Sequence, residues 1–84
     1  MHGEPKTIQV LYFALLRERR GLGAETVETR AATPRELYDE LALKHRFGFG
    51  HETLKAAIND EFAAWDHPLH AGDQVVFITP VAGG

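Results

Sequence analysis

Gln74-Val75-Val76-Phe77-Ile78-Thr79 is the most informative segment of this 84-residue chain. Its β-branched and aromatic residues are typical of a strand, in which successive side chains point to opposite faces of a sheet. Val75 and Phe77 would share one face, and Val76 and Ile78 the other. An edge strand with one solvent-facing side would alternate apolar and polar residues. This strand is therefore predicted to lie at the centre of a sheet, or to place one face against a partner.

The last strand leads directly into Pro80-Val81-Ala82-Gly83-Gly84. Two interpretations of this ending are open. Chain termini are commonly frayed, and glycine, with the largest conformational freedom of any residue, contributes little to a fold. Alternatively, the two glycines present the Gly84 carboxylate on a narrow stalk that can enter a confined site. The tail alone favours fraying, so the rest of the chain has to decide.

The first half of the chain begins with a second strand that is apolar on both faces, Thr7–Phe13. Helix formers follow over residues 14–20, and Gly21 stands where a helix C-cap glycine belongs. Among them the arginines at 17, 19 and 20 are interpreted as a solvated helix end. Glu25–Arg30 is a predicted polar strand at an edge of the sheet.

The main helix has a well-defined start at Thr33-Pro34-Arg35-Glu36. Thr33 can cap the helix, Pro34 suits its first position, and Glu36 completes a capping box. Behind this start, Leu37, Leu41 and His45 recur at helical spacing and form an apolar stripe. Gly48 is predicted to end the helix.

A tight hairpin is predicted between the main helix and the last strand, with Asn59-Asp60-Glu61 joining two short apolar runs. Its second arm contains Phe62 and Trp65. These aromatics either pack in the core or anchor a partner, because exposed Trp and Phe are frequent binding hot spots. In the turn-rich segment that follows, Leu69 is expected to reach the core.

These elements predict an α+β roll formed by a mixed sheet of four to five strands, with one main helix packed on one face. The order is strand, helix, strand, main helix, hairpin, last strand. Eighty-four residues suffice for one domain spanning 1–84. Residues 1–6 are expected to be a frayed leader and residues 80–84 a flexible tail.

Composition excludes several classes of function. The chain has no cysteine and no serine, so it can form no disulfide, no Cys-ligated zinc site and none of the usual acyl-transfer triads. A net charge of −3 without a basic patch argues against nucleic-acid binding. No apolar run approaches the ~20 residues that span a membrane, so we expect a cytoplasmic protein.

Metal binding and stand-alone catalysis also lack support in the sequence. His67 and His70 are three residues apart, but zinc sites need three or four ligands at defined spacing. Asp60 and Glu61 are adjacent in a turn and cannot face each other across a substrate. We therefore expect no bound metal or cofactor and no catalysis by this chain alone.

The order of elements, the segment Asn59–Leu69, the turn Ala71-Gly72-Asp73 and the ending Phe77–Gly84 together resemble the small subunit of molybdopterin synthase. This MoaD family belongs with ThiS among ubiquitin-like sulfur carriers. The resemblance implies a β-grasp fold whose first and last strands lie parallel at the sheet centre. One departure is visible, because Thr79 stands where the first of two prolines is usual.

The resemblance further implies a function for the tail. An E1-like activating enzyme would use ATP with magnesium to adenylate Gly84, and sulfur would replace AMP to give a thiocarboxylate. The synthase large subunit would receive the tail and pass the sulfur to cyclic pyranopterin monophosphate, in a heterotetramer. The expected functional residues are Gly84, the tail residues Pro80, Val81, Ala82 and Gly83, and the interface residues Phe77, Phe62 and Trp65. Alternatives are a carrier for thiamin thiazole synthesis and a ubiquitin-like binding module with an inert tail.

Overall fold

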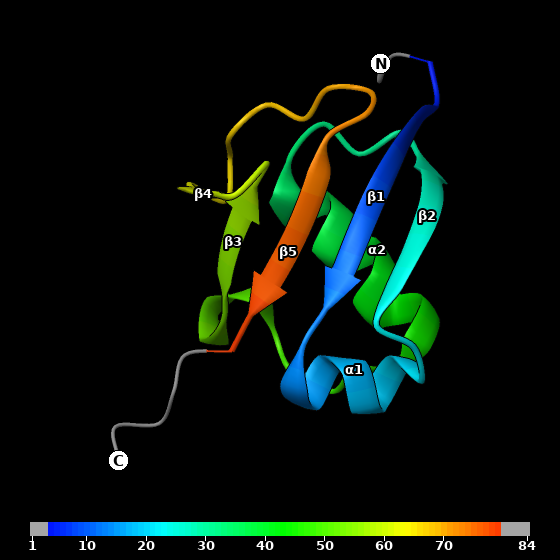
Figure 1. The fold of residues 1–84 in the computed structure, drawn as a ribbon, viewed down its shortest axis with the longest axis vertical. Coiled ribbons are helices and arrows are strands. Elements are labelled where there is room, and N and C mark those ends of the chain that lie inside the picture. Colours follow the sequence, from blue (N-terminus) through cyan, green and yellow to red (C-terminus); the bar gives the residue numbers. More distant parts are fainter. Residues whose placement is uncertain (1–3, 80–84) are drawn as a thin grey trace.

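The computed structural model describes residues 4–79, which form a five-stranded mixed sheet with helices against it (Figure 1). In chain order the elements are β1 (Lys6–Tyr12), α1 (Ala14–Arg20), β2 (Ala24–Thr29), α2 (Pro34–His45), the 3-10 helix η1 (His51–Thr53), β3 (Lys55–Ile58), β4 (Glu61–Ala63) and β5 (Gln74–Ile78). The sheet order is β2-β1-β5-β3-β4. Strands β1 and β5 are parallel, and the other neighbouring strands are antiparallel. The predicted roll with its parallel central pair is confirmed.

The two strands predicted to be central are β1 and β5, and β2 lies at an edge as expected. Strand β1 begins at Lys6, one residue earlier than predicted. Lys6 pairs with Thr29 of β2, and its Nζ donates a hydrogen bond to the Ala31 carbonyl oxygen at 2.7 Å. Lys6 is therefore part of the sheet and not of a frayed leader.

Helix α2 begins as the capping motif predicts. The Glu36 backbone N–H donates to Thr33 Oγ1 at 3.2 Å, and Pro34 occupies the first turn. In a standard capping box the Glu36 carboxylate would accept a hydrogen bond from the backbone N–H of the cap residue, Thr33. Here it accepts from the backbone N–H of the preceding residue, Ala32, at 2.9 Å. The helix start is thus fixed by local hydrogen bonds on both sides of Thr33.

The end of α2 differs from the prediction. The helix stops at His45, three residues before Gly48, and Arg46 adopts the left-handed conformation (φ 56°) as its C-cap. The Arg46 N–H donates to the Ala42 carbonyl oxygen, and the reversal turns Phe47 into the core, where it is fully buried. Burial of a Phe side chain contributes roughly 2–3 kcal/mol, which exceeds the strain of one left-handed non-glycine residue.

The hydrophobic core lies between the sheet and α2, and Leu69 belongs to it as predicted. Figure 1 shows α2 crossing one face of the sheet and leaving the other face uncovered. The largest fully buried side chains are those of Tyr12, Tyr38, Phe47 and Phe77. No helix among residues 4–79 combines the length and apolarity needed to cross a membrane.

The predicted hairpin is formed by β3 and β4, with Asn59 and Asp60 as its two turn residues. Their φ angles are 51° and 75°, as a two-residue turn between twisted strands requires. Glu61 is the first residue of β4 and pairs with Ile58. Trp65 lies in a turn beyond β4, so its placement in the second arm of the hairpin was wrong.

Candidate functional site

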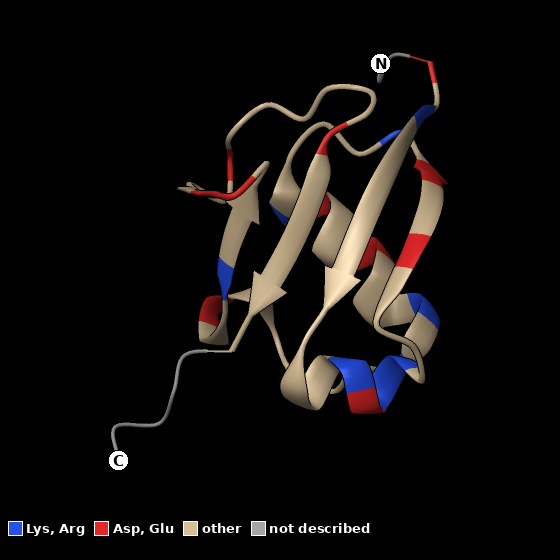
Figure 2. Ribbon diagram, viewed as in Figure 1, with Lys and Arg blue, Asp and Glu red and all other residues tan. Residues whose placement is uncertain are grey.

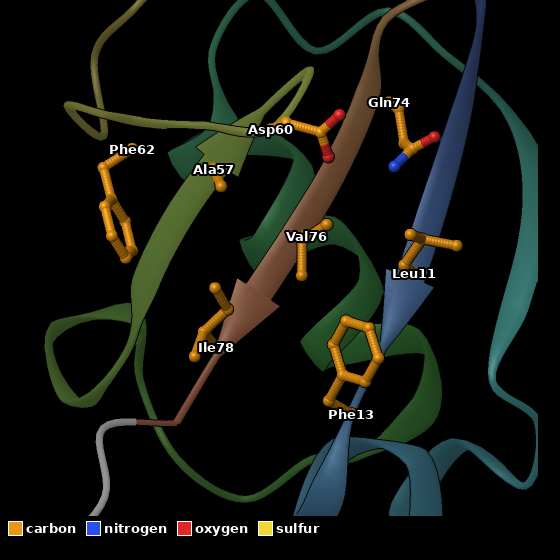
Figure 3. A pocket seen from close by; sticks show the side chains of 8 residues that line it. All are labelled: Leu11, Phe13, Ala57, Asp60, Phe62, Gln74, Val76 and Ile78. Atoms are coloured by element: carbon orange, nitrogen blue, oxygen red, sulfur yellow. The ribbon is translucent and has the colours of Figure 1, made fainter.

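The uncovered face of the sheet carries an apolar hollow of about 270 Å³. Figure 3 shows the side chains around it, contributed by four adjacent strands and the segments that flank them. We call the apolar part of this surface the docking face; it consists of Leu11, Phe13, Ala57, Phe62, Val76 and Ile78.

Strand register explains why these residues meet. Val76 of β5 pairs with Leu11 of β1 on one side and with Ala57 of β3 on the other, and Ala57 pairs with Phe62 of β4. Directly paired residues point to the same face of a sheet. A continuous apolar row therefore crosses four strands on the side opposite α2.

Exposure distinguishes this surface from the core. Phe62 is 75% exposed and Phe13 51% exposed, whereas Val76 and Ala57 form a nearly buried floor between them. Large aromatic side chains that surround an apolar hollow on an otherwise polar domain mark a protein-binding surface. The docking face can bury two phenylalanines against a partner without any rearrangement of the sheet.

Of the three predicted interface residues, only Phe62 lies on the docking face. Phe77 is fully buried and makes an edge-to-face contact with Tyr38 of α2, so its assignment to the interface was wrong. Trp65 stacks on Phe77 with ring centroids 5.9 Å apart and is packed against the core. Phe77 and Phe62 lie on opposite sides of the sheet, which is why they cannot serve one surface.

Five other docking-face residues were not predicted as interface residues: Ala57 of β3, and four on or next to the central strands, Leu11, Phe13, Val76 and Ile78. The signal for them was present in the sequence, because both central strands alternate apolar side chains on two faces. What the sequence pattern does not reveal is which face the helix covers. Phe77 contacts Tyr38 of α2, so the helix covers the face of β5 that carries Phe77. Val76 therefore lies on the open face, together with the residues that pair with it in the neighbouring strands.

Phe13 is presented by the sharp junction between β1 and α1. Its backbone is extended, and the next residue, Ala14, has a left-handed φ of 51°. The Phe13 carbonyl oxygen then accepts hydrogen bonds from the backbone N–H groups of Leu16 and Arg17. The chain thus turns sharply at Ala14 and leaves the Phe13 ring at the edge of the hollow (Figure 3).

An ion-pair network holds α1 in this position. Arg20 at the end of α1 donates two hydrogen bonds to the Glu25 carboxylate, both at 2.8 Å, and the Tyr12 hydroxyl donates a third at 2.7 Å. Chiefly because of the hydrogen bonds from Arg20, the pKa of Glu25 is lowered to about 2. Burial, followed by the contact with Glu25, raises the pKa of Tyr12. Arg20 is therefore a structural residue, and its interpretation as part of a solvated helix end was wrong.

The predicted tail site lies outside the described residues. This applies to Gly84 and to Pro80, Val81, Ala82 and Gly83. The structure describes the approach to them, since β5 ends at Ile78, a residue of the docking face. The described part of the chain ends at Thr79, one residue after Ile78 of the docking face.

Within residues 4–79, no three His, Cys, Asp or Glu side chains gather closely enough to hold a metal ion. His67 Nδ1 lies 2.9 Å from the Pro68 carbonyl oxygen. His70 Nδ1 lies 4.0 Å from Asp73 Oδ2, a carboxylate oxygen that already accepts the His70 backbone N–H. These contacts stabilise a turn.

The strand order, the parallel central pair and the single long helix across one face define a ubiquitin-like β-grasp domain with one apolar face left open. Comparison with known proteins agrees with this class. The chain belongs to the ThiS family, whose sequence profile matches residues 10–84.

One relative is the molybdopterin synthase sulfur carrier subunit of Escherichia coli (strain K12), which is 39% identical over 80 residues, covering 92% of this chain and 99% of the relative. The crystal structure of SAMP1 from Haloferax volcanii superposes with a TM-score of 0.77 at 26% identity, covering 93% of this chain and 99% of that one. A complex of subunits 1 and 2 of molybdopterin-converting factor from Helicobacter pylori matches with a TM-score of 0.62 at 25% identity, over 93% of this chain and 99% of the matched chain.

Proposed function

We propose that this protein is the sulfur carrier subunit of a molybdopterin synthase. The observation that carries the proposal is the docking face, an open apolar surface that reaches the end of β5 in a ThiS-family chain ending in Gly83-Gly84. A sulfur carrier needs two parts: a folded domain that binds the partner by one face, and a C-terminal segment without bulky side chains that carries the reactive group. The relative at 39% identity favours the molybdopterin pathway over thiamin thiazole synthesis.

The proposed chemistry takes place at the Gly84 carboxylate. A carboxylate is a poor acyl donor, so an E1-like enzyme first has to convert it. One carboxylate oxygen attacks the α-phosphorus of ATP, pyrophosphate leaves, and an acyl adenylate forms. Hydrosulfide (HS⁻) then attacks the carbonyl carbon, AMP leaves and a proton is released, which yields the thiocarboxylate. In this scheme ATP and magnesium belong to the activating enzyme, and the carrier holds no cofactor of its own.

The second half of the cycle is delivery. The docking face binds the large subunit of the synthase, and the tail extends into its active site. There the thiocarboxylate sulfur is transferred to cyclic pyranopterin monophosphate. Residues 80–84 reach at most about 18 Å when fully extended, so the receiving site has to lie within that distance of Thr79. Glycine at both final positions leaves the carbonyl carbon open to attack, since neither residue has a Cβ.

The partner assignment is supported by the Helicobacter pylori structure, in which a chain of this fold is in complex with a second subunit. We infer that the present chain likewise acts as the non-catalytic, sulfur-donating subunit of a larger assembly. The complete enzyme is proposed to be a cytoplasmic heterotetramer of two carriers on a dimer of large subunits. The activating enzyme would use the carrier before that assembly forms.

Intact-mass spectrometry tests the proposal directly. Incubation with the activating enzyme, ATP and a sulfur source is expected to raise the mass of the carrier by the difference between one sulfur and one oxygen atom. Deletion of Gly84, or addition of one alanine after it, is expected to abolish the mass change and sulfur transfer while the fold and docking are retained. Sulfur transfer at the wild-type rate by the Gly84 deletion would overturn the carrier function.

A further inference from the structure

One positive charge lies beside the apolar docking face. Lys55, the first residue of β3, pairs with Ile78 of β5, and paired residues share a face of the sheet. Lys55 is exposed and lines a second shallow hollow together with Phe62 and Ala63. Lys55 is the charged residue of β3, which Figure 2 shows with a blue segment, and none of the five residues of the neighbouring strand β5 is charged. The Lys55 ammonium group therefore lies at the end of the docking face where β5 ends.

The opposite end of the same surface carries a negative charge. Asp60, in the β3–β4 turn, lines the apolar hollow next to Gln74, the first residue of β5. Figure 3 shows Asp60 and Gln74 at one end of the hollow, and Phe13 and Ile78 at the other. The docking face thus carries a negative charge, Asp60, near the start of β5 and a positive charge, Lys55, near its end.

Neither charge has a partner in the part of the domain that the structure describes. Among residues 4–79, no ion pair or side-chain hydrogen bond involves Lys55 or Asp60. By contrast, Lys6 is bonded to the Ala31 carbonyl oxygen. A partner that covers the phenylalanines removes water from both charges, and a charge that is desolvated without a counter-charge opposes binding strongly.

We propose that the synthase large subunit places a carboxylate against Lys55 and a cationic or hydrogen-bond-donating side chain against Asp60. The inference rests on the proposed function and adds to it what fixes the orientation of the large subunit on the docking face. An apolar surface alone permits several rotations of the partner, whereas two opposite charges at its ends select one. The selected orientation brings the partner's acidic group next to the end of β5, where the tail enters the active site.

Zero-length cross-linking identifies the carboxylate. A carbodiimide joins an amine to a carboxylate only when the two groups are in contact. The chain has three lysines, Lys6, Lys44 and Lys55. When the carrier is mixed with its purified large subunit, we expect a cross-linked peptide that contains Lys55. Lys44 is the internal control, because it is exposed on α2 on the other side of the sheet.

Association kinetics test the effect of the charge. Lys55→Glu is expected to slow association with the large subunit about tenfold at low salt, and the difference should shrink as salt is added. Asp60→Asn keeps a side chain that tolerates the positive φ and is expected to slow association by a smaller factor. Lys44→Glu changes the net charge by the same amount as Lys55→Glu and should stay within about twofold of wild type.

The outcomes separate the two proposals. Equal association rates of Lys55→Glu and Lys44→Glu at every salt concentration, or cross-links through Lys44 alone, would overturn the charge-directed orientation. Both results leave the carrier function intact, since that function depends on Gly84. If the wild-type carrier does not bind the large subunit at all, the proposed function itself fails, and the orientation fails with it.

Discussion

Phe77 and Ile78 are neighbours in β5, yet Phe77 is fully buried against Tyr38 of α2 while Ile78 lines an open hollow. The two faces of this strand are similarly apolar and differ in what covers them. One face is covered by the chain's own helix, and the other is available to another protein. A small domain has few residues with which to bind partners, and an uncovered sheet face supplies a preformed, rigid surface for that purpose.

The faces also differ in how polar groups are arranged. On the covered side, both buried tyrosine hydroxyls have partners within the domain: Tyr12 donates to Glu25, and Tyr38 donates to the Phe49 carbonyl oxygen at 2.8 Å. On the open side, Lys55 and Asp60 have no such partners among residues 4–79. The tyrosine hydroxyls of the covered face are satisfied within the domain, whereas the charges of the open face are proposed to find their partners on another protein.

The largest effect is expected on the covered face. Phe77→Ala removes a fully buried ring that contacts both Tyr38 and Trp65, and should lower the free energy of unfolding by about 3–5 kcal/mol. Urea denaturation followed by tryptophan fluorescence measures the change. A loss of less than about 1 kcal/mol would show that Phe77 is not part of the core, since truncation of a buried ring leaves a cavity.

The same truncation on the open face should affect binding and leave folding almost unchanged. Phe62→Ala is expected to change unfolding free energy by no more than about 0.5 kcal/mol and to weaken binding to the large subunit at least tenfold, roughly the effect of losing a hot spot. Calorimetric titration measures the affinity.

Leu43→Ala is the matched control for this binding effect. Leu43 is an even more exposed apolar residue, 84% accessible, but it lies on α2. Its truncation should leave affinity unchanged. Equal losses of affinity in Phe62→Ala and Leu43→Ala would show that the docking face is not where the partner binds.

The sequence was sufficient to predict most of the fold, because each element carries a local signal: the cap at Thr33, the Gly21 helix stop and the Asn59-Asp60 turn. It was also sufficient to show that β5 is apolar on both faces. It was insufficient to assign the faces, so Phe77 was placed at the interface and Phe13 was not. That assignment depends on which side α2 crosses, and this is a property of the connections between elements that no single strand's pattern contains.

Two local details escaped prediction for a related reason. Arg46 reverses the chain after α2 although a glycine follows two residues later, because the reversal buries Phe47. Trp65 leaves the hairpin to stack on Phe77. In both cases a tertiary contact overrides the local preference that the sequence displays.

A third prediction concerns the polar groups of the covered face. Glu25, with its pKa of about 2, stabilises the folded protein in its charged form. The unfolded chain has the ordinary glutamate pKa of about 4.3, so this stabilisation is complete above that pH and is lost as the pH falls towards 2. The loss amounts to at most about 3 kcal/mol, and thermal unfolding between pH 6 and 2.5 measures it.

Glu25→Gln should remove most of this pH dependence, and Glu28→Gln on the same strand is the control that retains it. Because Glu25 holds Arg20 at the end of α1, the junction at Phe13 should loosen together with the network. As the pH is lowered, wild-type affinity for the large subunit is then expected to fall more steeply than that of Glu25→Gln. An acid response that is the same in Glu25→Gln and Glu28→Gln would show that the network on the covered face does not support the presentation of Phe13 on the open one.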